Sequence, residues 1–421
     1  MSSSSVDPVG KMELSLQLES ALAETRALPG FENFLSHPEP EALIGVADRG
    51  PVVVINVSGW RCDALLLRPG GVTVQELPGL TESSVARHVL EYLETLSGLD
   101  APMHRLHQAE LRLDAGEQSF EVFREVTDAR NACIRALNAI ESMLTSVTEW
   151  MWDVIAEPVL SALGLGAAMP GDSDPPRLWW CPTGLLGLLP LHAAGRGGDG
   201  VLDRVVSSFT PTLRALAEAR RQPADGSDAR LLIVTASEVP DAPALLDVDR
   251  ERAFLTDLFT GRHTLLDAEE AVVRRVRAEL PRHRWVHFSC HGAQDLLQPS
   301  RGGLLLTDGR LTVGDIGTGH FRGEFAFLSA CQTATGGLFL PDEAVTLTAA
   351  LHYAGYRHVI GTLWSVDDQV AAEVTEAVYG DLTAAGVFDP ARSARALHRA
   401  TTELRGRTAL SAWVPFIHTG P

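Results

Sequence analysis

The sequence contains no long hydrophobic run and comparatively little basic charge. No apolar stretch approaches the roughly 18 residues that a membrane-spanning helix needs, and the opening MSSSSVDPVGKMELSLQLE lacks the apolar segment of a signal peptide. The sequence contains 35 Lys and Arg and 54 Asp and Glu, which gives a formal net charge of −19. Because phosphate binding requires clustered cations, we expect a cytoplasmic protein whose partners are proteins rather than membranes or nucleic acids.

Cysteine is also scarce. The five cysteines are an odd number at scattered spacings without a CxxC pair: Cys62, Cys133, Cys181, Cys290 and Cys331. This pattern builds no disulfide framework and suits a reducing compartment, in which a thiol can serve as a nucleophile. The sequence also lacks a P-loop, a GxGxxG and a GxSxG motif, so nucleotide binding and serine hydrolysis find no support and we expect no cofactor.

What the chain does contain is a large supply of core residues in two successive patterns. Hydrophobic residues make up 45% of the 421 positions, enough for a large α/β core. Residues 1–40 predict a helical lead-in. Residues 41–221 begin with short β-branched runs and continue, over 83–163, with apolar residues at helical spacing, which predicts a lobe of strands and long helices. A linker rich in Pro, Gly and Ser precedes a second lobe at 228–421.

In the second lobe short apolar strands alternate with helices, which predicts a mostly parallel sheet covered on both faces. Two of these strands stop on a reactive side chain: WVHFSCHG carries His291 and FAFLSACQTA carries Cys331. Functional residues gather at the carboxyl ends of strands in such sheets, and neighbouring strands lie about 5 Å apart. We therefore expect the imidazole and the thiol to approach each other at one edge of the sheet.

A histidine beside a cysteine is the arrangement that a thiol nucleophile needs, because the imidazole keeps the sulfur as thiolate and later protonates the leaving amine. The N–H groups of Gly292 and Cys331 could form an oxyanion hole. The alternative is an inert buried cysteine, a common state of this residue. A metal site fits less well: His287, Cys290 and His291 are close in sequence, but strand alternation separates them and no fourth ligand follows at the usual spacing. We expect no metal.

Several motifs together resemble the CHAT domain, a caspase-like family of cysteine peptidases in the same clan as caspases and separase. They are HFSCHG, LSACQTA, the pair Asp342-Glu343, AGYRHVIGTLWSVDD and the final W.PFI..G, in this order, and the likeness extends over roughly residues 41–421. The resemblance implies an endopeptidase with His291 as general base and Cys331 as nucleophile. It also implies a caspase-like α/β fold in which residues 41–221 form a pseudo-caspase lobe containing long helices.

Substrate preference is also suggested by this resemblance. LWSVDD is similar to a separase stretch in which an Asp four residues after a Trp binds the P1 arginine, which maps to Asp368 with Asp367 beside it. Trp364 is a further candidate for substrate binding, with a place in the core or in a pocket wall as its alternative. A carboxylate in a partly dry pocket holds a guanidinium by paired charged hydrogen bonds. The alternative is that one aspartate caps the helix beginning near Gln369. Asp342 and Glu343 are further candidates for the substrate groove, with a helix-start role as their alternative.

Three interpretations of function follow. The first is a peptidase that cleaves specific proteins after a basic residue, controlled by a partner protein or by activation; the family resemblance suggests a bacterial immune or cell-death pathway. The second is a catalytically silent CHAT module that serves as a scaffold. The third is a redox sensor that uses the thiol of Cys331.

Overall fold

The computed structural model describes residues 8–28, 43–167, 175–221, 229–239, 244–295, 297–330, 333 and 346–421. The chain divides into two compact units, Met1–Gly45 and Val46–Pro421. The first unit contains helix α1 (Pro8–Arg26), and the strands of the described residues belong to the second. None of the described helices is long and apolar enough to cross a membrane.

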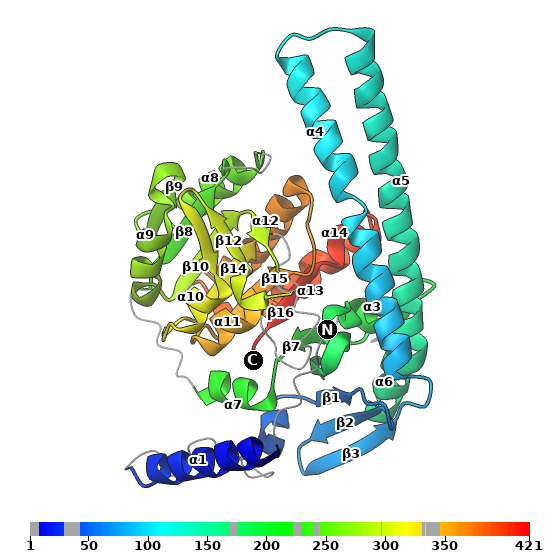
Figure 1. Cartoon of the computed structure of the whole chain (residues 1–421), viewed down its shortest axis with the longest axis vertical. Helices are drawn as coiled ribbons and strands as arrows, with labels where there is room; N and C mark the ends of the chain where they lie inside the picture. Colours follow the sequence, from blue (N-terminus) through cyan, green and yellow to red (C-terminus); the bar gives the residue numbers. More distant parts are fainter. Residues whose placement is uncertain are drawn as a thin grey trace. The chain divides into compact units, whose positions relative to one another are not determined.

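An 11-stranded sheet forms the centre of the second unit among the residues described (Figure 1). From one edge to the other its strands are β3 (Gly71–Glu76), β2 (Asp63–Arg68), β1 (Val52–Asn56), β4 (Arg177–Pro182), β7 (Val206–Phe209), β16 (Phe416–Thr419), β15 (His358–Thr362), β14 (Phe325–Ser329), β10 (Trp285–Cys290), β8 (Leu231–Ala236) and β9 (His263–Asp267). The pairs β1–β2, β2–β3 and β15–β16 are antiparallel, and the other pairs are parallel. The prediction of a mostly parallel α/β sheet is confirmed.

Strand β16 joins the two halves of this sheet. It pairs in parallel with β7 and antiparallel with β15, so the parallel strands of the second half run opposite to those of the first. The carboxyl ends of β8, β10, β14 and β15 consequently lie together at one edge. The predicted lobes, 41–221 and 228–421, share one continuous sheet, and the boundary between them stays a prediction.

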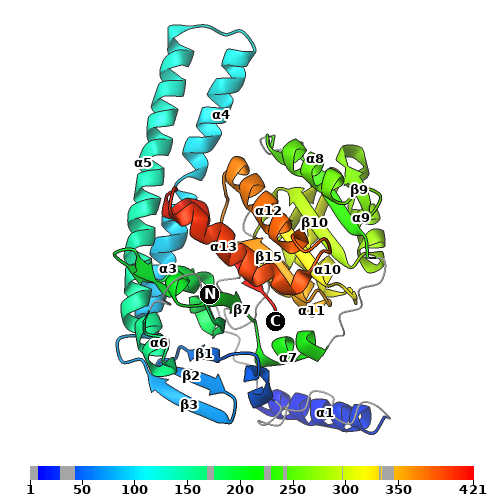
Figure 2. The same ribbon diagram turned by 180° about the vertical axis from the view of Figure 1, so that it is seen from behind.

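Helices cover both faces of the second half of the sheet (Figures 1 and 2). One face packs against α8 (Val248–Leu258), α12 (Asp368–Thr383) and α13 (Ser393–Arg405). The other packs against α9 (Val273–Glu279), α10 (Val313–Gly317) and α11 (Leu347–Tyr353). Alternation along β10 explains this division, because Trp285 belongs to the first cluster and Phe288 to the second.

Long helices characterise the first half. They are α3 (Glu82–Ser97), α4 (Asp100–Asp114) and α5 (Phe120–Met151), followed by a π-helical turn (Trp152–Ala156) and α6 (Glu157–Leu163). Helix α5 buries a stripe at three- and four-residue spacing, Val122, Val126, Ala129 and Cys133, and packs along α4. The α4–α5 hairpin extends well beyond the sheet in both views (Figures 1 and 2).

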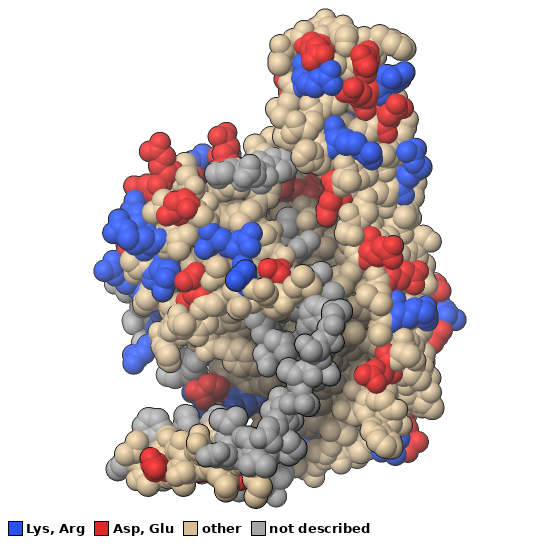
Figure 3. All heavy atoms as spheres, viewed as in Figure 1, with Lys and Arg blue, Asp and Glu red and all other residues tan. Residues whose placement is uncertain are grey.

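Acidic and basic side chains are interspersed over the face drawn in Figure 3, without a continuous basic stripe. At the tip of the α4–α5 hairpin, Arg112 pairs with both Glu117 and Glu125. Such exposed pairs contribute little to stability. Because positive and negative side chains alternate on the face drawn in Figure 3, it lacks the positive electrostatic field that attracts a phosphate backbone.

Candidate active site

The ends of β10 and β14 lie side by side. Their parallel register aligns Ser289 with Ser329, the last residue of β14. His291 follows β10 directly, and Ala330 follows β14. Cys331 is the next residue in the sequence, and it lies outside the described residues, as do Asp342 and Glu343. The structure therefore describes one side of the predicted dyad and the strand that leads to the other.

His291 links β10 to a small antiparallel sheet made of β11 (Gly292–Ala293), β12 (Gly303–Leu306) and β13 (Gly309–Thr312). Its side chain is half-buried, and its carbonyl accepts the N–H of Leu305 at 2.8 Å. Gly292 stands opposite Leu304 in the next position of this ladder. In an antiparallel ladder bonded and non-bonded pairs alternate, so the N–H of Gly292 faces away from β12.

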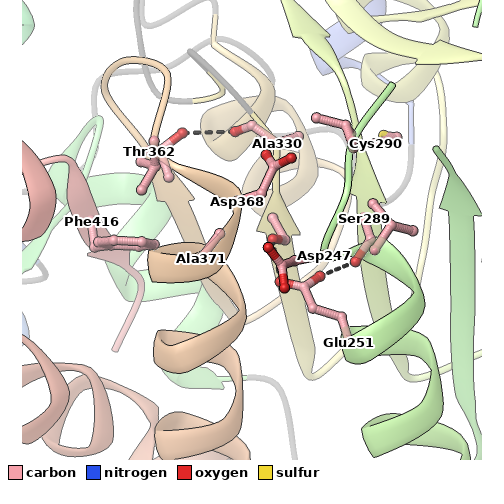
Figure 4. A pocket seen from close by; sticks show the side chains of 13 residues that line it. Asp247, Glu251, Ser289, Cys290, Ala330, Thr362, Asp368, Ala371 and Phe416 are labelled. Carbon is pink, nitrogen blue, oxygen red and sulfur yellow. Dashed lines mark hydrogen bonds between the residues drawn. The ribbon is translucent and has the colours of Figure 1, made fainter. Parts of the chain in front are cut away.

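A pocket, here called the acidic pocket, opens at the same edge of the sheet (Figure 4). The described residues enclose a volume of about 30 Å³, room for about two water molecules. Its walls come from the start of α8, the ends of β10, β14 and β15, and the start of α12. The lining residues are Leu245, Asp247, Val248, Glu251, Ser289, Cys290, Ser329, Ala330, Thr362, Val366, Asp368, Ala371 and Phe416.

Asp367 and Asp368 have different surroundings. Asp367 caps α12 by accepting the N–H of Gln369 at 3.0 Å and that of Val370 at 3.4 Å. Asp368 lines the acidic pocket, and its carboxylate accepts the N–H of Leu246 at 3.0 Å. The structure thus assigns the helix cap to Asp367 and leaves Asp368 directed into the pocket.

The electrostatics of the pocket act mainly on Asp368. Burial is the largest cause that raises the pKa of Asp368, and the neighbouring charges of Asp367 and Asp247 raise it further. The hydrogen bond from Leu246 and the field of His291 oppose this rise without reversing it. A carboxylate that is costly to ionise gains more than an ordinary one from a cation beside it. The influence of His291 also means that its imidazole lies within electrostatic reach of Asp368.

Trp364 does not line the acidic pocket. Its side chain is buried, its indole N–H donates to the carbonyl of Ser411 at 3.3 Å, and its ring meets that of Tyr92 edge-on with centroids 5.8 Å apart. Ser411 lies in α14 (Leu410–Trp413), whose first N–H groups donate to Glu141 of α5 at 2.9 Å. In this structure Trp364 therefore connects the loop after β15 to the helices of the first half.

His287 and Cys290 do not gather with His291. His287 is fully buried and bonds to Glu251, whereas Cys290 packs in the core cluster of the opposite face. Across the described ranges there is no group of three or more His, Cys, Asp or Glu side chains arranged to hold a metal ion.

The sequence interpretation missed Glu251, which lies in the floor of the acidic pocket. The sequence of this helix contains a pattern that indicates the burial of Glu251. Val248, Glu251 and Leu255 follow the three- and four-residue spacing of one helical face, and all three are buried. An acid inside an apolar stripe indicates a buried partner, but the neighbouring charges of DVDRERAF make the stripe hard to recognise in the sequence.

Comparisons with known proteins concern the family and the fold. The model of the CHAT domain family matches residues 145–421, and no curated protein matches the chain. Two crystal structures of the Saccharomyces cerevisiae separase–securin complex are similar, with TM-scores of 0.55 and 0.56, identities of 12% and 11%, and 99% of this chain covered. The Arg-specific cysteine proteinase gingipain R is similar over 67% of this chain and 75% of its own, with 12% identity and a TM-score of 0.41. The chain spans about a third, 32%, of the separase chains that it matches, and at these identities the likeness concerns the fold.

Proposed function

The chain belongs to the CHAT domain family, and from this membership we propose that it is a cysteine endopeptidase in which His291 and Cys331 form the catalytic dyad. The observation that carries the proposal is the register of β10 and β14. Ser289 and Ser329 are partners across two parallel strands, and the histidine and the cysteine each follow two residues later in the sequence. Adjacent parallel strands are about 4.8 Å apart, a separation from which an imidazole and a thiol can meet.

The proposed reaction begins when His291 takes the proton of the Cys331 thiol. The thiolate attacks the scissile carbonyl carbon, a carbon–sulfur bond forms, and the carbonyl electron pair moves onto oxygen. The N–H of Gly292, which faces away from β12, supports a role for this group in holding the oxyanion, with the N–H of Cys331 as the second donor. The intermediate collapses, the carbon–nitrogen bond breaks, and His291 returns the proton to the departing amine.

Hydrolysis of the acyl enzyme completes the cycle. His291 removes a proton from water, the resulting hydroxide attacks the thioester carbon, and the sulfur leaves as thiolate with the carboxylic acid product. His291 then returns its proton to the thiolate, and the dyad regains its starting protonation.

We also propose that the acidic pocket receives a basic P1 side chain, with Asp368 as its partner. The support is a carboxylate that faces the pocket, whose pKa is raised by burial, and that needs no part in capping α12. A guanidinium satisfies such a group by paired hydrogen bonds, whereas a neutral side chain leaves it unpaired. Asp342 and Glu343 stay predictions for the substrate groove.

Control by a protein partner is part of the proposal. An open and a closed arrangement of the pocket would give such a partner a means of control. Separase was crystallised with securin, which shows that a protein of this fold can be bound by another protein. Binding of a partner that favours the open pocket would activate this enzyme by shifting its population.

A peptide library tests the activity and the preference together. Wild type and the variants Cys331→Ala and His291→Ala are compared, with melting temperatures as the control for folding. We expect cleavage after Arg or Lys by wild type alone. Cleavage that persists in Cys331→Ala refutes the dyad. No cleavage by any form, together with a biological output that survives in Cys331→Ala, favours the silent scaffold instead.

A further inference from the structure

A buried carboxylate lies beneath the two strand ends that lead to the dyad. Glu251 is only 3% exposed. One of its oxygens accepts hydrogen bonds from the hydroxyl of Ser289 and from Nε2 of His287, the latter at 3.1 Å. The other accepts the hydroxyls of Ser329 at 2.7 Å and Thr375 at 3.0 Å. Four donors from β10, β14 and α12 therefore converge on one side chain of α8.

These contacts fix the protonation of the cluster. Burial by itself would raise the pKa of Glu251, but the hydrogen bond and the charge of His287, together with the hydrogen bonds from Ser289 and Ser329, overcome this effect and hold the pKa below its usual value. Nε2 of His287 must then carry a proton to donate to the carboxylate. The hydroxyl of Tyr379 lies 3.2 Å from Nδ1, so both ring nitrogens have a hydrogen-bond partner.

All four acceptor positions of the Glu251 carboxylate are occupied by these donors. Although Glu251 lies in the floor of the acidic pocket, it has no acceptor left for a substrate cation. Asp368, whose carboxylate accepts the N–H of Leu246, is the carboxylate that we assign to the P1 side chain. Of the three acids that line the pocket, Asp247, Glu251 and Asp368, Glu251 and Asp368 thus have separate tasks.

The position of the two serines in their strands connects this carboxylate to the proposed dyad. Ser289 and Ser329 are register partners, and each precedes a member of the proposed dyad by two residues in the sequence. The two oxygens of Glu251 bind one serine each. A single anion therefore ties the end of β10 to the end of β14, two residues before His291 and Cys331 in the sequence.

We propose that Glu251 is a positioning residue for the dyad, which sets the spacing and orientation of the ends of β10 and β14 through Ser289 and Ser329. The inference rests on the proposed function for its catalytic meaning. A neutral amide cannot replace the anion, because glutamine has one acceptor oxygen and turns two donors of its own toward hydroxyl or imidazole donors. At least one strand end must then move.

Three variants separate positioning from simple stability. Glu251→Gln removes the anion, and Ser329→Ala releases only β14. Thr375→Val removes a donor to the same carboxylate while leaving both strands attached, which makes it the matched control. Melting temperatures report folding, and titration with an irreversible thiol reagent counts the competent sites.

The first readout needs no peptide substrate. The rate at which iodoacetamide alkylates Cys331, located by peptide mass spectrometry, is measured against pH. Pairing with an imidazole lowers the midpoint below the value of about 8.5 for a free thiol, and we expect this low midpoint in wild type and Thr375→Val. We expect Glu251→Gln and Ser329→Ala to move the midpoint upward toward the free value.

The second readout is peptide turnover per titrated site. A displacement of about 1 Å costs about 100-fold in rate, so we expect kcat to fall by about this factor in Glu251→Gln with KM nearly unchanged. An unchanged alkylation profile and kcat in Glu251→Gln would overturn the proposal, as would an equal loss in Thr375→Val. Should Glu251→Gln not fold, Ser329→Ala decides the matter by the same criteria.

Failure of the proposed function gives a different pattern. If wild type cleaves no peptide but shows a low alkylation midpoint that Glu251→Gln abolishes, the peptidase proposal fails and the positioning role of Glu251 stands. A wild-type thiol that titrates like free cysteine overturns both.

Discussion

Asp368→Asn is the most direct test of the acidic pocket. The change removes the charge but keeps the shape, and the amide oxygen can still accept the N–H of Leu246. Removing the charge of one partner of a buried, hydrogen-bonded ion pair costs roughly 2 to 5 kcal/mol. Asp368 is only half-buried, so the lower part of this range, about 2 to 3 kcal/mol, applies. At 1.4 kcal/mol per tenfold, kcat/KM for an arginine substrate should fall about 30- to 150-fold.

Stability should change in the opposite direction. The raised pKa of Asp368 means that the folded state binds its proton more tightly than the unfolded state does. The contribution of this group to folding is therefore present at acid pH and lost as the pH rises through its folded pKa. Asn removes this loss, so we expect Asp368→Asn to melt at a higher temperature than wild type at neutral pH while it cleaves arginine substrates less well.

The adjacent residue supplies a matched control. Asp367→Asn makes the same chemical change at the helix cap, where Asn and Asp are about equally good, so activity and melting temperature should stay close to wild type. The assay compares kcat/KM for peptides that carry Arg, citrulline or Gln at P1. If Asp368→Asn keeps the preference for Arg over citrulline, or if Asp367→Asn loses it, the assignment of Asp368 to the specificity pocket is wrong.

Three further predictions concern the framework of the site. Trp364→Phe loses the hydrogen bond to Ser411 but keeps an aromatic ring, so urea unfolding should show a loss of about 1 kcal/mol with an unchanged P1 profile; a changed profile would make Trp364 a substrate contact. Glu141→Gln can accept only one of the two N–H groups at the start of α14 with its oxygen, so we expect a loss of about 1 kcal/mol, and an unchanged unfolding curve contradicts this link. Burial lowers the pKa of His192 from 6.5 to about 4, so stability should be full above pH 6.5 and fall as the pH drops toward 4, by about 3 kcal/mol at 1.36 kcal/mol per unit. His192→Gln should flatten this part of the stability curve, and an equally steep fall in the variant would contradict it.

Local patterns predicted the sheet and the place of His291 well. The apolar run of β10 is buried at every residue from Trp285 to Cys290, as a strand covered on both faces must be. The predicted alternative roles of Asp367 and Asp368 could not be assigned from sequence, because both lie within one residue of a helix start. The direction of the Asp368 carboxylate depends on the backbone N–H of Leu246, more than a hundred positions away in the chain.

The role of Trp364 depended on tertiary structure in the same way. Its place before the aspartates suggested a substrate contact, whereas its neighbours in the structure are Tyr92 of α3 and the carbonyl of Ser411. For Glu251 the helical periodicity indicated that the side chain is buried. It could not indicate the hydrogen-bond donors that stabilise the buried anion, because these come from three other elements. Long-range partners of this kind have no signature in a local pattern.

The indole of Trp364 makes the conformation of the pocket wall partly a property of the other half of the sheet. The hydrogen bonds from Glu141 through Ser411 to Trp364 end a few residues before Asp368, so we expect that a molecule holding α5 more firmly in one arrangement of this loop would also alter the affinity of the proposed enzyme for substrate. Thermodynamic reciprocity then requires substrate to alter the affinity for that molecule by the same factor. One can therefore search for molecules whose affinity for the α4–α5 hairpin changes when an inhibitor with a P1 arginine is present. Such molecules would be regulators, and the search does not require a physiological substrate.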